Sequence, residues 1–83
     1  MRPNGQPVTG WVLIRTNDSQ RVASEIKKIP GIEGLIGTVG NFDLIARLGV
    51  EEPNVLVSTV LRKIQTISGV RTTETLPSFS PEI

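Results

Sequence analysis

The sequence predicts one small α+β domain built from two consecutive strand–helix–strand units. Stretches rich in β-branched residues alternate with stretches whose apolar residues recur at helical spacing. Equivalent helix-to-strand corners recur at residues 29–32 (IPGI) and 67–70 (ISGV). With 83 residues, the chain has room for one hydrophobic core. We place it in residues 8–76, between a disordered arm (1–7) and a C-terminal tail (77–83).

The first predicted strand, residues 8–16 (VTGWVLIRT), is apolar on both faces. Val12 and Ile14 point to one side of it, and Trp11 and Leu13 point to the other. An antiparallel sheet with one face in water should alternate apolar and polar residues, and this strand does not. A partner must therefore cover the face of Trp11 and Leu13, and we expect a second copy of the chain to do so, through a dimer interface.

The first predicted helix follows at once. Asn17 and Gln20 have the spacing of a capping box, in which each side chain bonds the other's backbone. Pro30-Gly31 ends the helix, because proline lacks the amide donor and glycine tolerates the left-handed cap. Its apolar stripe consists of Val22, Ala23, Ile26 and Ile29.

The second and third strands are predicted at residues 32–39 and 42–48, joined by a two-residue turn at Gly40-Asn41. The second helix is predicted to begin at residues 51–53 (EEP), because acidic residues and proline suit a first turn. Its stripe consists of Leu56, Val57, Val60, Leu61, Ile64 and Ile67.

A last strand at residues 70–76 completes the order βαββαβ. This order predicts the ferredoxin-like fold, a four-stranded antiparallel sheet with two helices on one face. The other face is then free to dimerise.

The amino-acid composition argues against catalysis and metal binding. The chain has no cysteine, histidine or tyrosine, so we expect no catalytic residues, no metal site and no cofactor. A net charge of +1 does not indicate the basic surface that is typical of nucleic-acid-binding proteins. No apolar run is long enough to span a membrane, and no secretory signal is found, so we expect a cytoplasmic protein.

The predicted hairpin is the most informative segment. Backbone N–H groups at its tip can bind a carboxylate, and Asp43 offers a negative charge beside them, so together they suit an amino-acid zwitterion. The alternative is that Asp43 only hydrogen-bonds its own turn, which is common.

The chain resembles the effector-binding (RAM) domain of the leucine-responsive regulator/AsnC family. The similar stretches are VLIRT, IPGI, TVGNFDLIARL and SGVRTTETL, in register over residues 8–76. The glycine–x–aromatic–aspartate hairpin is the most specific of them. The family often has an acidic residue where Asn41 stands.

This resemblance implies a ligand site and an assembly. Family members form dimers through their sheets, and the dimers join into rings that bind amino acids or related metabolites between them. Carried over by position, the ligand-binding residues are Gly40, Asn41, Phe42, Asp43, Thr73 and Thr75. The family's DNA-binding half precedes this domain, and residues 1–7 are too few to form it. We therefore expect no direct DNA binding, and any action on DNA would require co-assembly with a full-length regulator.

Two further functions remain open. The chain could be a purely structural oligomer with a vestigial pocket, in which case the two threonines reflect strand propensity alone. It could also be a small dimeric enzyme, since other ferredoxin-like dimers are oxygenases or isomerases. Their sites commonly use histidine or tyrosine, so we expect a binding module and not an enzyme.

Overall fold

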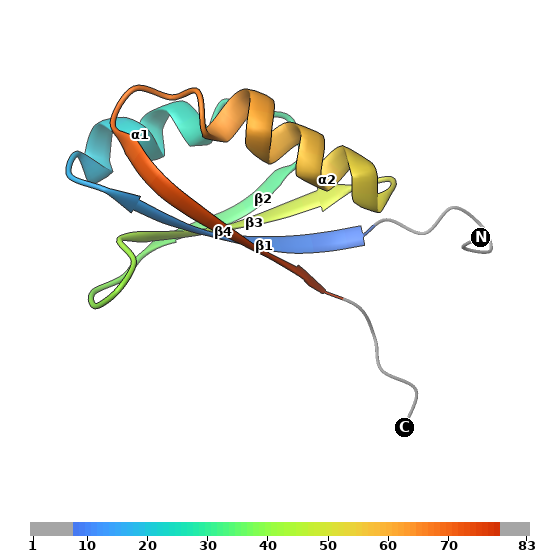
Figure 1. The fold of residues 1–83 in the computed structure, drawn as a ribbon, viewed down its shortest axis with the longest axis horizontal. Helices are drawn as coiled ribbons and strands as arrows, with labels where there is room; N and C mark the ends of the chain where they lie inside the picture. Colours follow the sequence, from blue (N-terminus) through green and yellow to red (C-terminus); the bar gives the residue numbers. More distant parts are fainter. Residues whose placement is uncertain (1–7, 79–83) are drawn as a thin grey trace.

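The computed structural model describes residues 8–78 and confirms the predicted ferredoxin-like fold (Figure 1). The predicted arm, and residues 79–83 of the predicted tail, lie outside the described residues. The elements are, in chain order, β1 (Val8–Thr16), α1 (Ser19–Ile26), β2 (Ile32–Gly37), β3 (Leu44–Val50), α2 (Pro53–Thr59), the π-helix η2 (Val60–Ile64) and β4 (Val70–Ser78).

The four strands form one antiparallel sheet in the order β2-β3-β1-β4. Both helical segments lie on the same side of this sheet, and no helix of the described part covers the other side (Figure 1). The strand with two apolar faces, β1, is central, whereas β4 lies at an edge. β4 continues to Ser78, two residues into the segment predicted as a tail, and Pro77 is tolerated there because an edge strand needs fewer amide donors.

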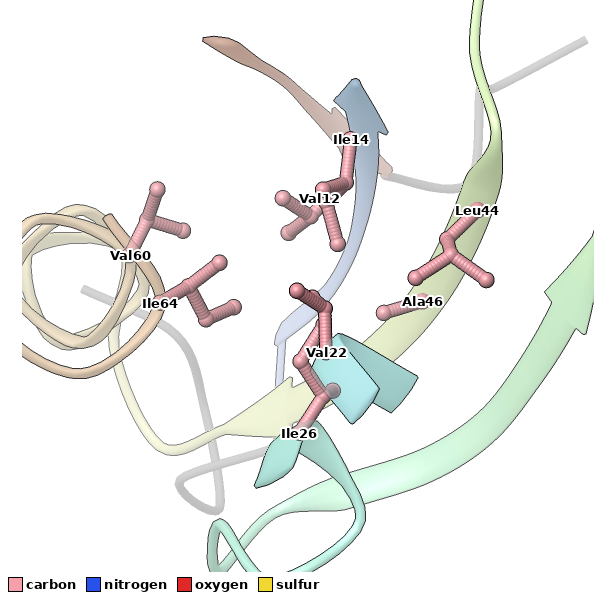
Figure 2. Packing of buried hydrophobic residues seen from close by; sticks show 8 residues of the cluster. All are labelled: Val12, Ile14, Val22, Ile26, Leu44, Ala46, Val60 and Ile64. Carbon is pink, nitrogen blue, oxygen red and sulfur yellow. The ribbon is translucent and has the colours of Figure 1, made fainter. Parts of the chain in front are cut away.

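The core lies between the helices and the sheet (Figure 2). Its larger cluster joins residues from both helical segments to the two central strands: Val12, Ile14, Val22, Ile26, Leu44, Ala46, Val60 and Ile64. A smaller cluster consists of Leu48, Val50 and Leu56. The prediction for β1 is thus confirmed, because Val12 and Ile14 are buried while Trp11 lies on the other face.

Gly10 permits the close packing of α2 on the sheet. A Cβ atom at this position would overlap Leu56 Cδ1, well inside van der Waals contact. The residue itself is buried. A glycine is therefore required for the smaller cluster to form around Leu56.

The predicted capping box of α1 is wrong. The helix begins after Asp18, and no side chain caps it. The carboxylate of Asp18 instead accepts a hydrogen bond from Arg21 Nε at 2.9 Å. The backbone N–H of Asp18 donates a hydrogen bond to Thr16 Oγ1 at 3.0 Å. The local bonds of Asp18 therefore set the start of the helix one residue later than predicted.

The second helix changes its winding. Residues 60–64 form a π-helix, and Gln65 N–H donates to the carbonyl of Val60, five residues back, at 2.9 Å. The wider turn keeps Leu56, Val60 and Ile64, four residues apart, on the core side. Two members of the predicted stripe, Val57 and Leu61, are therefore not core residues, and 54% and 53% of their surfaces are exposed.

Candidate functional site

The hairpin between β2 and β3 is longer than the two-residue turn predicted at Gly40-Asn41. β2 ends at Gly37, and Thr38 N–H donates to the carbonyl of Asp43 at 2.9 Å, which leaves four residues in the turn. Thr38 Oγ1 also donates to the carbonyl of Phe42 at 2.8 Å. Gly40 has φ +116°, a conformation that favours glycine, so the sequence did mark the tip correctly.

Asp43 joins the hairpin to the end of β1. Its Oδ2 accepts a hydrogen bond from the backbone N–H of Thr16 at 2.9 Å, and its own N–H donates to the carbonyl of Ile14 at 2.9 Å. Thr16 is buried, so this bond satisfies a donor with little access to water. The carboxylate thus has a structural role, but its partner is in another strand and not in its own turn. A carboxylate oxygen has more than one lone pair, so this bond does not prevent a second partner.

The tip of the hairpin is exposed. Val39 is 99% exposed, Gly40 and Asn41 are also exposed, and Phe42 is half-buried. The hairpin extends away from the helices, below the sheet in Figure 1. No backbone hydrogen bond within residues 8–78 uses the N–H groups of residues 39–42. These donors are therefore available to a ligand or a second chain.

Thr73 and Thr75 lie on β4, on the helix-facing side of the sheet, opposite Ile14 and Val12 of β1. Both are half-buried. Thr73 Oγ1 accepts a hydrogen bond from Gln65 Nε2 at 2.7 Å. Both residues line a hollow of about 360 Å³, which we call the β4 hollow. Its lining consists of Gln65, Val70, Arg71, Thr72 and Thr73. Thr75 does not line it.

One chain does not bring the hairpin and the β4 threonines into a single pocket. Asp43 lies beside Ile14 on one side of β1, and Thr73 pairs with Ile14 on the other side. Two strand spacings, about 10 Å, therefore separate them. Thr73 and the hairpin lie at the same end of the sheet, whereas Thr75 lies opposite Val12 in the middle of β1.

Only Thr73 of the lining residues was predicted as a site residue; Gln65, Val70, Arg71 and Thr72 were not. Gln65 is placed by the π-turn, which the spacing of the apolar residues does not reveal. Arg71 lies at a bulge, where the pairing of β4 shifts between Arg15↔Thr72 and Thr16↔Val70. No sequence signal marked Arg71, because Arg15 of β1 and Arg47 of β3 lie in comparable apolar strands.

The uncovered side of the sheet, which we call the open face, carries the predicted interface residues Trp11 and Leu13. Register places Arg47 and Leu76 on either side of Trp11, and Ile45 and Glu74 on either side of Leu13. Trp11 is 38% exposed, and the guanidinium of Arg47 lies 5.9 Å from its ring centroid. A second hollow, of about 230 Å³, opens on this side and is lined by Trp11, Gly34, Leu35, Ile36, Ile45 and Arg47.

The open face is mainly apolar, but it carries Arg47 on the central strand β3 and Glu74 on the edge strand β4. Ile36 and Leu76 are exposed there. Arg47 pairs with Glu33 at 3.4 Å. An exposed apolar patch is typical of a protein–protein interface.

Among residues 8–78, no three acidic side chains lie close enough together to hold a metal ion. None of the helices found in this part is both long and apolar enough to cross a membrane.

Comparison with known proteins identifies relatives of this fold. The family model described as "Lrp/AsnC ligand binding domain" matches residues 9–82. Among solved structures, TTHA0845 from Thermus thermophilus is 28% identical with a TM-score of 0.82, and the match covers 92% of this chain and 98% of that one. A comparison with curated proteins gave no match.

Two regulators share the fold at lower identity. AsnC of E. coli is 19% identical with a TM-score of 0.80, over 92% of this chain and 53% of AsnC. The transcriptional regulator NMB0573 from Neisseria meningitidis, solved as a complex with L-Met, is 13% identical with a TM-score of 0.77, over 88% of this chain and 50% of the regulator. The chain therefore spans about half the length of these two regulators.

Proposed function

Because the chain belongs to the Lrp/AsnC ligand-binding domain family, we propose that it binds an amino acid or a related small metabolite between two copies of itself. The open face mediates dimerisation, and dimers join into larger rings. The domain acts in the cytoplasm as a sensing and assembly module, not as an enzyme. It contacts DNA only through a full-length regulator of the same family with which it co-assembles.

Family membership is the observation that carries this proposal. The geometry supports it in two ways. The hairpin offers unpaired N–H groups and a carboxylate at Asp43, and β4 offers Thr73 beside a hollow at the same end of the sheet. The open face supplies an apolar surface for a second copy. The neighbouring regulator solved with L-Met adds an amino acid as the first ligand to test.

A purely structural oligomer is the second candidate. The bond between Asp43 and the N–H of Thr16 favours it, because the carboxylate then has a sufficient reason to be present without a ligand. In that case the hairpin only closes the end of the sheet.

The test combines a thermal-shift screen with light scattering. Each protein amino acid is added in turn, and a binder present at about a hundredfold above its Kd should stabilise the domain by about 2.7 kcal/mol. Light scattering at micromolar concentration should give the mass of a dimer or a larger assembly. Assembly without stabilisation by any amino acid would favour the structural oligomer, and a compact monomer would contradict both candidates.

A further inference from the structure

The second helical segment, α2 with η2, carries an exposed apolar surface on the side of the sheet away from the open face. Val57 and Leu61 are each more than half exposed, and Pro53 is exposed as well. These three residues are four apart, so they lie along one side of the helix, and we call them the outer patch. The patch lies outside the core because the π-helix keeps a different set of positions buried. π-helical turns recur at functional sites.

The outer side of this helix is also neutral. Residues 53–61 (PNVLVSTVL) contain no charged side chain. A helix at the surface of a domain usually has charged residues on the side that faces water. The first helix follows this rule, since α1 and the turn after it carry four exposed charged residues, Arg21, Glu25, Lys27 and Lys28. A surface without charges is typical of the centre of a protein–protein contact.

Charges of opposite sign lie at the two ends of the neutral stretch. Glu51 and Glu52 precede the helix, and Arg62 and Lys63 follow the stretch. All four are exposed, and the ion pairs found within residues 8–78 use none of them. The segment therefore presents an acidic start, an apolar middle and a basic end.

Val57 lies at the centre of this arrangement. It is five residues from both Glu52 and Arg62, and four residues from both Pro53 and Leu61. A second copy of the helix, placed antiparallel by a two-fold axis at Val57, would bring the acidic start of each copy over the basic end of the other. The same axis would bring Leu61 over Pro53 and Val57 over its own counterpart. The outer patch is thus complementary in charge to itself, as a contact between identical chains requires.

We infer that the outer patch joins copies of the chain through antiparallel contact of their second helices, and that the joined copies belong to different open-face dimers. This inference rests on the proposed function, which assigns the first contact to the open face, and it adds a second contact on the opposite side of the sheet (Figure 1). A stable pair of single chains needs about 800 Å² of contact on each partner, and the outer patch, with three side chains, is too small to supply it. Each dimer carries two outer patches, one in each helical layer, so the contact repeats and assembles dimers into larger complexes.

Charge reversal at either end of the helix tests the complementarity. In Glu51→Lys with Glu52→Lys both ends are basic, and in Arg62→Glu with Lys63→Glu both ends are acidic. Each double variant should remain a dimer in light scattering at concentrations where wild type forms a larger assembly, because like charges then face one another. An equimolar mixture of the two should regain the wild-type mass, since their ends are again complementary.

The matched control makes the same charge change on the other helix. Lys27 and Lys28 are exposed at the end of α1 and lie outside the outer patch. Lys27→Glu with Lys28→Glu should therefore keep the wild-type mass.

A single cysteine tests the two-fold position, because the chain has no cysteine of its own. In Val57→Cys the two thiols lie face to face across the axis. Mild oxidation with diamide should link them roughly a hundredfold faster than thiols that meet by collision, because their effective concentration is in the millimolar range. Ser24→Cys, at an exposed position of α1, is the control and should cross-link at the collision rate. Non-reducing gels measure both rates, and this test still decides if a charge variant fails to fold.

The outcomes separate this inference from the proposed function. Loss of the larger assembly in both charge variants, its return in the mixture and fast cross-linking of Val57→Cys support the inference. If both charge variants keep the wild-type mass, if the mixture stays dimeric, or if the two cysteine variants cross-link at the same rate, the inference is wrong and the open-face dimer stands. A wild-type protein that remains a dimer at all concentrations also contradicts the inference alone. A wild-type monomer would contradict both.

Discussion

At the scale of single residues, Asp43 has two roles that can be tested separately. It accepts a structural hydrogen bond from Thr16 N–H through Oδ2, and it is proposed to bind the ammonium group of a ligand. The bond needs only an acceptor oxygen, which asparagine also provides. Binding of an ammonium group needs the negative charge, which asparagine lacks. Substitution at this position can therefore distinguish the structural role from the binding role.

We predict that Asp43→Asn keeps the thermal midpoint and the mass of the assembly while the affinity for the amino acid falls roughly tenfold to a hundredfold. A charge-assisted hydrogen bond contributes about 1.5–3 kcal/mol. Asp43→Ala should in addition destabilise the fold by about 1–3 kcal/mol, because the buried N–H of Thr16 loses its partner. Calorimetry and urea unfolding measure the two effects. Equal affinity for wild type and Asp43→Asn would show that the hairpin is only a turn.

Gly10 gives a second prediction at this scale. Gly10→Ala should lower the free energy of unfolding by about 1–3 kcal/mol, because the new methyl group meets Leu56. In the background of Leu56→Ala, which vacates that space, the same substitution should cost much less. A double-mutant cycle by urea unfolding measures this coupling. Additive costs would mean that Leu56 is not what excludes a side chain at position 10.

At the scale of elements, the sequence predicted the type and order of every strand and the two helical regions. β1 was predicted with its observed bounds, because its two apolar faces are typical of a buried strand. Pro30-Gly31 and Ser68-Gly69 marked the two helix-to-strand corners, where Gly31 and Gly69 have positive φ. The features that the sequence did not predict are departures from the regular spacing of residues in α-helices and β-strands. The π-helix shifted the core stripe, and the bulge at Arg71 created part of the β4 hollow.

The hairpin shows the same limit. Gly40-Asn41 has the composition of a two-residue turn, but the Asp43–Thr16 bond, between residues 27 apart in sequence, fixes a longer one. The predicted ligand-binding residues lie in two groups on either side of β1, and Thr75 lies opposite Val12 in the middle of that strand. Within one chain about 10 Å separates the two groups, because β1 lies between them.

Because of the π-helix, two nearby residues of the second helix should contribute differently to the free energy of unfolding. Ile64→Ala should cost about 2–4 kcal/mol, because Ile64 is fully buried in the larger core cluster. Leu61→Ala should cost about 0.5 kcal/mol or less, because half of the side chain is already exposed. Urea unfolding of the two variants provides the comparison. Similar costs would mean that the regular α-helical stripe, and not the π-helix, describes the packing.

At the scale of the whole molecule, the sheet divides the domain into a helical layer with a packed core and an open face with exposed apolar residues. Trp11, Ile36 and Leu76 are the large apolar side chains of this face that are exposed among residues 8–78. A second sheet packed on the open face would bury residues from all four strands. The assembly would then contribute to the stability of each protomer.

We predict that Trp11→Glu shifts the protein to a folded monomer in light scattering. The glutamate would lie opposite Arg47, with which it can pair in the free protomer, but burial in an interface would cost several kcal/mol. Leu61→Glu is the control, because Leu61 is similarly exposed but lies in the helical layer. That variant should remain at least a dimer. Loss of assembly in Leu61→Glu alone would place the dimer contact on the helices.

The pairing of β1 with β4 also sets the order of events in folding. Thr9 pairs with Ser78 and Thr16 with Val70, so the first and last strands of the domain are neighbours along their whole length. During synthesis β1 emerges first, yet one of its edges has no partner until β4 is made, nearly a whole domain later. Closing this long loop is entropically costly, so the pairing that completes the sheet forms late. A ribosome must therefore release almost all of the domain before the central strand β1 can be paired on both edges.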